Sequence, residues 1–327
     1  MGLVYYNGKF IPEQNVQKAN DEARVLRLLR SYLDKNEPGV VRILVNTWRS
    51  QGKAITYKEI REAILVGDVT QEWLEDWMQD YNRFVKEHLQ PAWEKAMDAA
   101  TEEIRRKYPI WYFDPMGDGV RYWTDLHSAE FVTNITTTQM EGLRAVIRRA
   151  SVLEDMTVDQ LARAIRPMVG LTMQQSIANM NYYETLIKGG MSEKKALDKS
   201  IRYAARQHRY RGYNIARTEL AMAYNAGAHE GTKQAQAAGL IGECVKVWCT
   251  AADERVCGIC GYLNGKSVGM DEDFIYEHTD RYGNTVQRRI NPKLTNADSG
   301  KKPPAHPSCR CGVQYKEISP PKFQNNK

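Results

Sequence analysis

The sequence predicts a mainly α protein that ends in a small α+β domain. Apolar residues recur at helical spacing through most of residues 14–237, as in amphipathic helices. The alternation that is typical of strands begins only after Gly239, and two clusters of cysteine and histidine follow it. A chain of 327 residues is long enough for two or three domains. We expect a helical N-terminal domain over 1–110, a second helical region over 111–235, a small metal-binding α+β domain over 236–318 and a flexible tail over 319–327.

An extended segment and two helices open the chain. Residues 1–12 are rich in turn formers, with a turn at Asn7-Gly8. The spacing of the following apolar residues predicts a helix that ends near Asn36. Pro38 then opens a second helix, because proline is tolerated in a first helical turn, and Gly52 ends that helix.

One face of the next helix is aromatic. Trp73, Trp77, Tyr81 and Phe84 recur at a spacing that places them on one side. They form either the core of a helical bundle or a strip that docks a partner. Pro91 should kink or split this helix, because its ring excludes a backbone hydrogen bond.

The second helical region follows a stretch rich in proline and glycine at residues 108–119. Capping boxes, in which a threonine stands three residues before a glutamine, predict helix starts at Thr136, Thr157 and Thr172. Gly189-Gly190 then interrupts the pattern, and a long alanine-rich helix follows.

The C-terminal region changes to short strands and turns. Alternating apolar residues predict a strand at 244–249 and a last strand at 313–317. A turn is expected at 263–266, where Asn-Gly stands in the middle. Residues 278–305 are polar and basic, which predicts a long loop.

Five cysteine and histidine residues in this region have metal-ligand spacing. Cys257 and Cys260 form a C-x2-C pair, and His306, Cys309 and Cys311 form an H-x2-C-x-C group. Zinc prefers thiolate and imidazole ligands and takes four of them in a structural site. We therefore expect a structural zinc in a zinc-knuckle-like domain. Both an all-cysteine set and a set of three cysteines with the histidine remain open.

Two other interpretations of these cysteines are unmetallated buried thiols and disulfides. We expect no signal peptide, and clustered cysteines in a reducing compartment favour metal over disulfides. A catalytic zinc would need an open position and a general base, and no H-E-x-x-H or H-x-E pattern occurs. Cys244 and Cys249 are expected to be core residues, and Trp248 is expected to pack beneath the zinc.

The basic residues allow two interpretations. The net charge of +6 is compatible with a mildly basic soluble protein or with a nucleic acid nearby. An arginine stripe with interleaved tyrosine can track phosphates, although it can also be a solvated helix face. The candidate contacts for a nucleic acid or a partner are Arg202, Arg206, Arg209, Arg217, Arg288 and Arg289.

A carboxylate stands near the opposite face of the same helix. Glu219 would be costly to bury without a partner, so we expect it to meet an arginine, with Arg310 as first choice. The role expected of this pair is structural.

Several of these segments together resemble the phage Mu F-like minor head protein family, also called head morphogenesis proteins. In chain order they are Ile215-Ala-Arg-Thr-Glu219, Tyr224-Asn225-Ala-Gly227, Trp248, Asp253-Glu-Arg-Val-Cys-Gly-Ile-Cys260, Asn264-Gly265-Lys266 and Pro303-Pro-Ala-His-Pro-Ser-Cys-Arg-Cys311. Their order and spacing resemble the family over residues 200–317, and a weaker likeness extends back to Phe131. Residues 1–110 carry no such likeness.

The resemblance implies a minor, non-enzymatic component of a tailed-phage capsid. The partners it implies are the portal protein and the major capsid or scaffold proteins, with double-stranded DNA as a further contact. It implies a place in the capsid interior of the virion, and in the host cytoplasm during assembly. We expect no membrane span and no small-molecule substrate. The alternative function is a zinc-stabilised nucleic-acid-binding protein, and a metal-dependent nuclease has the least support.

Overall fold

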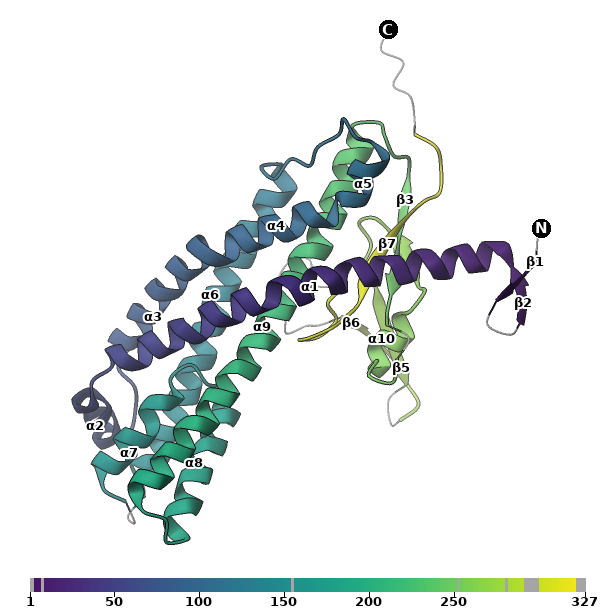
Figure 1. Ribbon diagram of the computed structural model, residues 1–327. Helices are drawn as coiled ribbons and strands as arrows, with labels where there is room; N and C mark the ends of the chain where they lie inside the picture. Colours follow the sequence, from purple (N-terminus) through teal and green to yellow (C-terminus); the bar gives the residue numbers. More distant parts are fainter. Residues whose placement is uncertain are drawn as a thin grey trace. The chain divides into compact units, whose positions relative to one another are not determined.

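The computed structural model describes residues 3–6, 9–153, 156–251, 253–279, 282–290 and 300–321, with side chains from Asp21 onward except those of Arg288 and Arg289. The protein is mainly helical with a small C-terminal sheet region, which confirms the predicted fold class (Figure 1). Among the described residues, no helix carries an apolar stretch long enough to cross a bilayer.

The helices account for most of the chain before residue 240. They are α1 (Glu13–Ala54), α2 (Tyr57–Val66), α3 (Gln71–Phe84), the π-helix η1 (Val85–Leu89), α4 (Gln90–Ala100), α5 (Glu102–Lys107), α6 (Asp118–Ala150), α7 (Val158–Ile165), the 3-10 helix η2 (Arg166–Met168), α8 (Met173–Lys188), α9 (Glu193–Ala237) and α10 (Gly258–Leu263). The strands are β1 (Leu3–Tyr6), β2 (Lys9–Pro12), β3 (Cys244–Cys249), β4 (Ser267–Gly269), β5 (Ile275–Thr279), β6 (Thr285–Arg289) and β7 (Gly312–Glu317).

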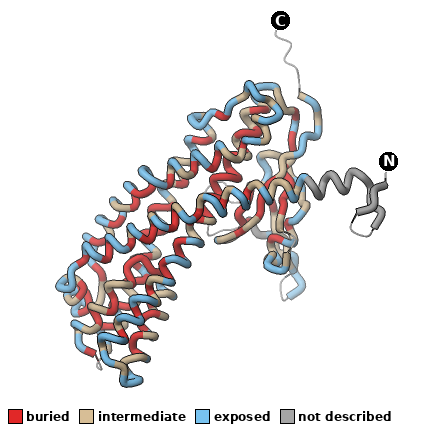
Figure 2. The backbone as a smooth tube through the Cα atoms, viewed as in Figure 1, coloured by how far each residue is buried: buried red, intermediate tan, exposed pale blue. Residues whose placement is uncertain are grey.

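The chain forms two compact units. Unit 1 comprises Met1–Glu37, Pro91–Leu126 and Arg217–Lys327, and unit 2 comprises Pro38–Gln90 and His127–Ala216. Helices α1, α6 and α9 contribute residues to both units. The predicted domains were continuous in sequence, whereas these units combine distant segments. Figure 2 shows buried positions, in red, alternating with exposed ones along the long helices, as expected for amphipathic packing.

One continuous helix replaces the two that were predicted around Pro38. Helix α1 runs through this proline from Glu13 to Ala54. The proline removes one backbone hydrogen bond, but buried side chains such as Leu33 and Val40 continue the apolar face on both sides of it. Packing therefore outweighs the local preference, and the proline coincides with the boundary between the two units.

The aromatic helix forms bundle core. Trp73, Trp77, Tyr81 and Phe84 are all buried, with exposures of 5% or less. The helix was expected to kink or split at Pro91. In the structure, the π-helical turn η1 interrupts the α-helix just before this proline, and α4 begins directly after η1.

Two of the three capping boxes are confirmed. At the starts of α7 and α8, the threonine hydroxyl accepts the backbone N–H of the glutamine three residues later, and the glutamine side chain accepts the backbone N–H of the threonine. The prediction for Thr136 is wrong, because this residue lies inside α6 and its hydroxyl donates to the Val132 carbonyl. A threonine can bond to its own helix in this way when the apolar face continues past it.

Unit 2 buries polar groups around Trp48. His208 stacks on the indole with ring centroids 5.5 Å apart, and its Nε2 lies 2.8 Å from the Val169 carbonyl oxygen. The buried Arg211 guanidinium lies over the same indole and donates to the Gly170 carbonyl. Gly170 has a positive φ of 89°, and a Cβ there would overlap the Trp48 ring, so both backbone and space require glycine.

The C-terminal strands form two small antiparallel sheets within unit 1. Strand β3 lies between β4 and β7, with Trp248 opposite Val313. Both predicted strands are thus confirmed. The turn at 263–266 also forms, but it joins α10 to β4. The predicted loop at 278–305 contains a hairpin instead, in which β5 pairs with β6.

Candidate metal centre

The fold brings the two cysteine and histidine clusters together. Cys257, Cys260 and His306 offer ligand atoms that lie within 4.8 Å of one another. A second group of the same kind contains Cys260, Cys309 and Cys311. The two groups share Cys260, so all five residues predicted as ligands surround one place in unit 1. The cluster has a composition that could hold a metal ion.

The distances within the cluster fit a tetrahedral zinc site. Zinc–sulfur bonds of about 2.3 Å and zinc–nitrogen bonds of about 2.0 Å place neighbouring ligand atoms about 3.5–3.8 Å apart. The Cys260 and Cys309 sulfurs are 3.7 Å apart. The His306 Nε2 lies 3.3 Å from the Cys257 sulfur and 3.4 Å from the Cys260 sulfur.

The first cluster is shaped by the start of α10. Cys257 has an extended backbone and caps this helix, and its sulfur accepts the N–H of Cys260 at 3.4 Å. Gly258 and the short helix turn the chain so that both sulfurs face the same side. The cap therefore aims two ligand atoms at one point, which is how a knuckle presents its ligands.

Hydrogen bonding orients the histidine for a metal. The His306 Nδ1 lies 2.9 Å from the carbonyl oxygen of Pro307. Since a carbonyl can only accept, this nitrogen carries the proton of the neutral ring. Nε2 then presents its lone pair to the two sulfurs, as a metal-binding histidine does.

Helix α9 supports the second cluster from unit 1. Ser308 has a positive φ of 59°, and its N–H donates to the Thr218 hydroxyl at 2.9 Å. The Asn225 amide donates to the Ala221 carbonyl and, at 3.5 Å, to the Cys311 carbonyl. These contacts fix the backbone that carries the ligand residues.

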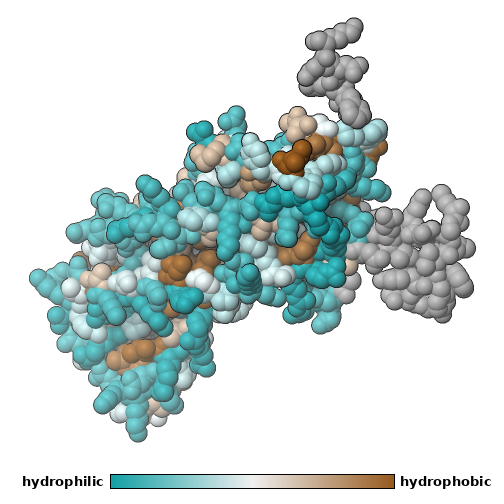
Figure 3. Space-filling model, turned by 45° about the horizontal axis from the view of Figure 1, so that its top comes forward, coloured by the Kyte–Doolittle hydropathy of each residue, from teal (hydrophilic) through white to brown (hydrophobic). Residues whose placement is uncertain are grey.

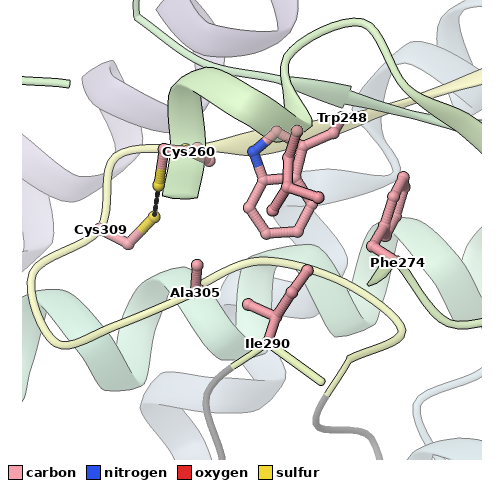
Figure 4. Packing of buried hydrophobic residues seen from close by; sticks show 8 residues of the cluster. Trp248, Cys260, Phe274, Ile290, Ala305 and Cys309 are labelled. Carbon is pink, nitrogen blue, oxygen red and sulfur yellow. Dashed lines mark hydrogen bonds between the residues drawn. The ribbon is translucent and has the colours of Figure 1, made fainter. Parts of the chain in front are cut away.

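Trp248 lies in the core that underlies the cluster. Its side chain is fully buried together with Cys260, Cys309 and Cys311, and its ring meets Phe274 edge to face at 5.2 Å. Figure 4 shows the indole between Phe274 on one side and the Cys260 and Cys309 sulfurs on the other, with Ile290 below it. The metal ligands and the apolar core are therefore one packed structure.

The sulfurs of the cluster lie close to one another, and three of them are almost fully buried. Hydrogen bonds with the Cys309 and Cys311 thiols are the main cause, and burial a smaller one, of a raised pKa for the Cys260 thiol. The site therefore favours the protonated thiol. A bound divalent cation would reverse this preference, because it stabilises thiolates directly. All six cysteines are free, so no disulfide competes for these sulfurs.

An ion pair connects the two clusters. Arg310 stands between Cys309 and Cys311 in sequence, and its guanidinium donates two hydrogen bonds to the Asp253 carboxylate, at 2.6 and 2.7 Å. We call this two-bond ion pair the fork. It holds the pKa of the Asp253 carboxyl well below its usual range. The partner found for Arg310 is thus Asp253. Glu219 is buried as expected, and its pairing with Arg310 stays a prediction.

The two cysteines outside the cluster are core residues. Cys244 and Cys249 are buried in β3; the Cys244 thiol donates to the Gly242 carbonyl just before the strand, and the Cys249 thiol donates to the Val247 carbonyl within it. Burial raises the pKa of Cys244 to about 11, which keeps its thiol protonated and unreactive. The prediction that these two residues serve packing agrees with this placement.

The basic residues predicted as contacts fall into three sets. Arg202, Arg206 and Arg209 are exposed on the unit 2 part of α9, beside the exposed Tyr210. Arg217 belongs to unit 1, and its guanidinium donates two bonds to the buried Glu37 at 2.7 and 2.9 Å. Its charge is therefore largely neutralised by a carboxylate. The backbone of Arg288 and Arg289 forms part of β6, and their side chains lie outside the described residues.

Sequence reasoning missed three supporting residues. Asp253 appeared only as part of a resembling segment, and no spacing rule pointed to Arg310 as its partner. Thr218 likewise appeared only within a resembling segment, and Thr250 carries no signal in sequence. The Cys311 thiol donates to the Thr250 hydroxyl at 3.3 Å, a contact between residues 61 positions apart.

Part of the chain matches a family model. The family model described as Phage Mu protein F like protein matches residues 156–314, a range that contains all five clustered cysteine and histidine residues. No curated protein and no solved structure matches the chain significantly. Over residues 156–314, just under half of its length, this chain is therefore similar to the phage Mu protein F-like family.

Proposed function

We propose that this chain is a minor head protein of a tailed bacteriophage that acts as a structural component in head morphogenesis. The observation that carries the proposal is the family match, which spans the helices α7 to α9 and the candidate metal centre. The proposed location is the capsid interior, with assembly in the host cytoplasm. No catalytic role is proposed.

The proposed cofactor is a structural zinc held by four of the five clustered side chains. Cys260, Cys309 and Cys311 are each 2% exposed or less. Cys257 and His306 are half-buried, and a set that is buried at three of its five members fits a structural zinc better than a catalytic one, which keeps a position open to solvent. The ion would tie α10 to the segment 306–311 across a long stretch of intervening chain.

An ordered apolar loop in unit 1 supports docking to a protein such as the portal or a capsid subunit. Ile110 and Tyr112 are 94% and 78% exposed. The loop is nevertheless anchored, because Phe113 is buried and the Asp114 backbone exchanges hydrogen bonds of 2.8 and 2.9 Å with the Gln234 side chain. On the face in Figure 3, brown apolar areas are small and surrounded by teal hydrophilic ones. Exposed apolar side chains that are held in a fixed loop are therefore a candidate contact surface for a protein.

The alternative function, a zinc-stabilised nucleic-acid-binding protein, has support from the exposed part of α9. Arg202, Arg206 and Arg209 share that surface with Tyr210 and Tyr213, which are 66% and 46% exposed. Arginine can contact phosphates and tyrosine can stack on bases. Under this alternative, affinity for duplex DNA should fall steeply with salt and with loss of these arginines.

The metal content of the purified, reduced chain tests the zinc proposal. We expect about one zinc per chain, because a tetrahedral site takes one ion. Cys260→Ser should abolish binding, since Cys260 belongs to both ligand groups. Cys244→Ala is the matched control, because it removes a buried cysteine outside the cluster and should keep the zinc.

Co-purification with the portal protein of the same phage tests the assembly role separately. A complex that survives size-exclusion chromatography supports the role, and loss of the complex on Ile110→Asp would assign the contact to the apolar loop. A chain that binds neither the portal nor the capsid and scaffold proteins contradicts the role. A folded, metal-free wild-type chain would contradict the zinc assignment alone.

A further inference from the structure

A cavity in unit 1 lies beside the candidate metal centre. Its volume is about 910 Å³. One wall is the face of α1 from Ala23 to Lys35, and the other includes Arg217 of α9 and residues close to the metal ligands, among them Arg310. We call this cavity the α1 groove. It contains none of the five metal-ligand side chains, so it is a separate feature.

The α1 groove is strongly basic. Its lining includes a single acidic residue, Asp34, beside six basic ones, which are Arg27, Arg30, Lys35, Arg217, Arg255 and Arg310. Two further carboxylates, Glu37 and Asp253, pair with Arg217 and Arg310 from outside the lining. Even with these pairs counted, the cations exceed the carboxylates. The groove therefore favours an anionic occupant.

The groove also has an apolar floor. Leu26, Leu29 and Leu33 follow one another along α1 at helical spacing, and the latter two are almost completely buried. The side chains of Arg217 and Arg310 are 33% and 26% exposed, so these cations lie within the walls. An occupant must enter the cavity to reach them.

These features favour a peptide over a nucleic acid. A duplex would meet only the exposed cations at the rim, such as Arg30 and Arg255, which are 72% and 65% exposed. Among the described residues, no aromatic one lines the cavity, so a single strand would find no stacking platform there. A narrow protein segment with both carboxylates and apolar side chains matches the cations and the leucine floor together.

We infer that the α1 groove binds an acidic, amphipathic segment of a partner protein. Its apolar side chains would lie against Leu26, and its carboxylates would pair with the rim and wall cations. This inference deepens the proposed assembly role by giving the chemistry of a partner, and rests on that role for the existence of the partner. Because Arg310 stands between two candidate ligands, the metal centre would also help to shape one wall.

Fluorescence anisotropy with a labelled helical peptide of about 18 residues, with leucine on one face and glutamate on the other, tests the inference. The matched peptide carries glutamine in place of every glutamate. The test variant of the full chain is Arg27→Gln with Arg30→Gln, which removes two charges from the groove and changes none of the candidate metal ligands. The control variant is Lys194→Gln with Lys195→Gln, which removes two exposed lysines from α9 in unit 2.

The glutamate peptide should bind with an affinity that falls as salt is added. Its affinity for the rim variant should be about tenfold lower than for the wild type, which is the effect expected for the loss of two exposed charge pairs. The glutamine peptide should bind more weakly, and the control variant should bind as the wild type does. The inference is overturned if the acidic peptide fails to bind at low salt, if both peptides bind equally, or if the rim variant has no effect.

Tighter competition by a duplex of about 20 base pairs, with the same dependence on Arg27 and Arg30, would assign the groove to nucleic acid and also overturn the inference. Metal content measured on the same samples separates this result from the zinc proposal. Zinc-loaded, folded protein that does not bind the peptide contradicts only the groove. Portal co-purification, measured independently, decides the assembly role.

Discussion

At the scale of single residues, the fork between Arg310 and Asp253 joins the two halves of the metal centre. Asp253 also accepts the N–H of Arg255 at 3.1 Å, and its carbonyl accepts that of Val256 at 3.2 Å. The carboxylate thus organises the turn that leads into Cys257, while its partner arginine lies among the other ligands. A group that orients ligands in this way affects metal affinity without touching the metal.

Asp253→Asn should weaken zinc binding about tenfold or more, because it removes the charge that holds Arg310 in place. Competition with a chromophoric chelator measures the change. Arg255→Gln is the control, since this exposed arginine contacts the same carboxylate only at 3.4 Å. Equal affinities for the wild type and Asp253→Asn would show that the ion pair is an independent surface feature.

His208 gives unit 2 a dependence on pH. Burial, as the largest cause, lowers the pKa of His208 to about 4, and the charges of Arg211 and Arg49 act in the same direction. The folded chain therefore prefers the neutral ring, whereas the unfolded chain takes up a proton near pH 6.5. Stability that is present above pH 6.5 should be lost as the pH falls towards 4, by about 3 kcal/mol in total.

Urea unfolding of unit 2, followed through its buried tryptophans between pH 7 and pH 4, measures this effect. His208→Gln should flatten the curve, because it removes the titrating ring while keeping a donor for the Val169 carbonyl. An unchanged slope in that variant would assign the acid sensitivity to other groups.

At the scale of elements, α9 and α4 cross so closely that their contact requires glycine. A Cβ on Gly227 would overlap the backbone of Met97, and one on Gly231 would overlap the side chain of Thr101. The two glycines are one helical turn apart, so they form a flat strip against α4. The segment that contains Gly227 is one of those that resemble the family, and this crossing gives a physical reason for its glycine in this chain.

Gly227→Ala should destabilise unit 1 by about 3 kcal/mol or more, because the clash is with backbone that cannot move aside. Gly39→Ala is the matched control in α1, where a Cβ would meet nothing within 4 Å. That substitution should stabilise its helix by about 0.5–1 kcal/mol. Thermal unfolding of both variants compares them directly, and similar behaviour would contradict the close crossing.

The elements that sequence predicted well are those with local causes. The capping boxes at Thr157 and Thr172 and the strands at β3 and β7 carry their signals in neighbouring residues. The errors at Pro38 and Thr136 arose where tertiary packing outweighs a local stop signal. The β5–β6 hairpin was missed because its strands are polar and lack a buried face that sequence could reveal.

At the scale of the whole molecule, the cluster of five candidate ligands could be predicted, whereas the residues that support it could not. Cysteine and histidine spacing points to these five side chains because metal chemistry restricts the residue types, and the fold brings them together. The fork from Asp253 and the contact from Thr218 depend on long-range placement, and arginine and threonine are common on any surface. Arg217 shows the same limit, since its helical position predicted a surface contact while the fold pairs it with Glu37.

The metal centre belongs to unit 1 alone, and this placement predicts that chelation acts on one unit first. A structural zinc contributes an apparent 10–16 kcal/mol, roughly the whole stability of a typical domain. Hydrogen exchange in a strong chelator should therefore rise in β3, α10 and β7, while α7 and α8 in unit 2 keep their protection. Since α1, α6 and α9 contribute to both units, their protection should fall only in the parts that belong to unit 1. A uniform loss along all three helices would mean that the two units unfold as a single cooperative structure.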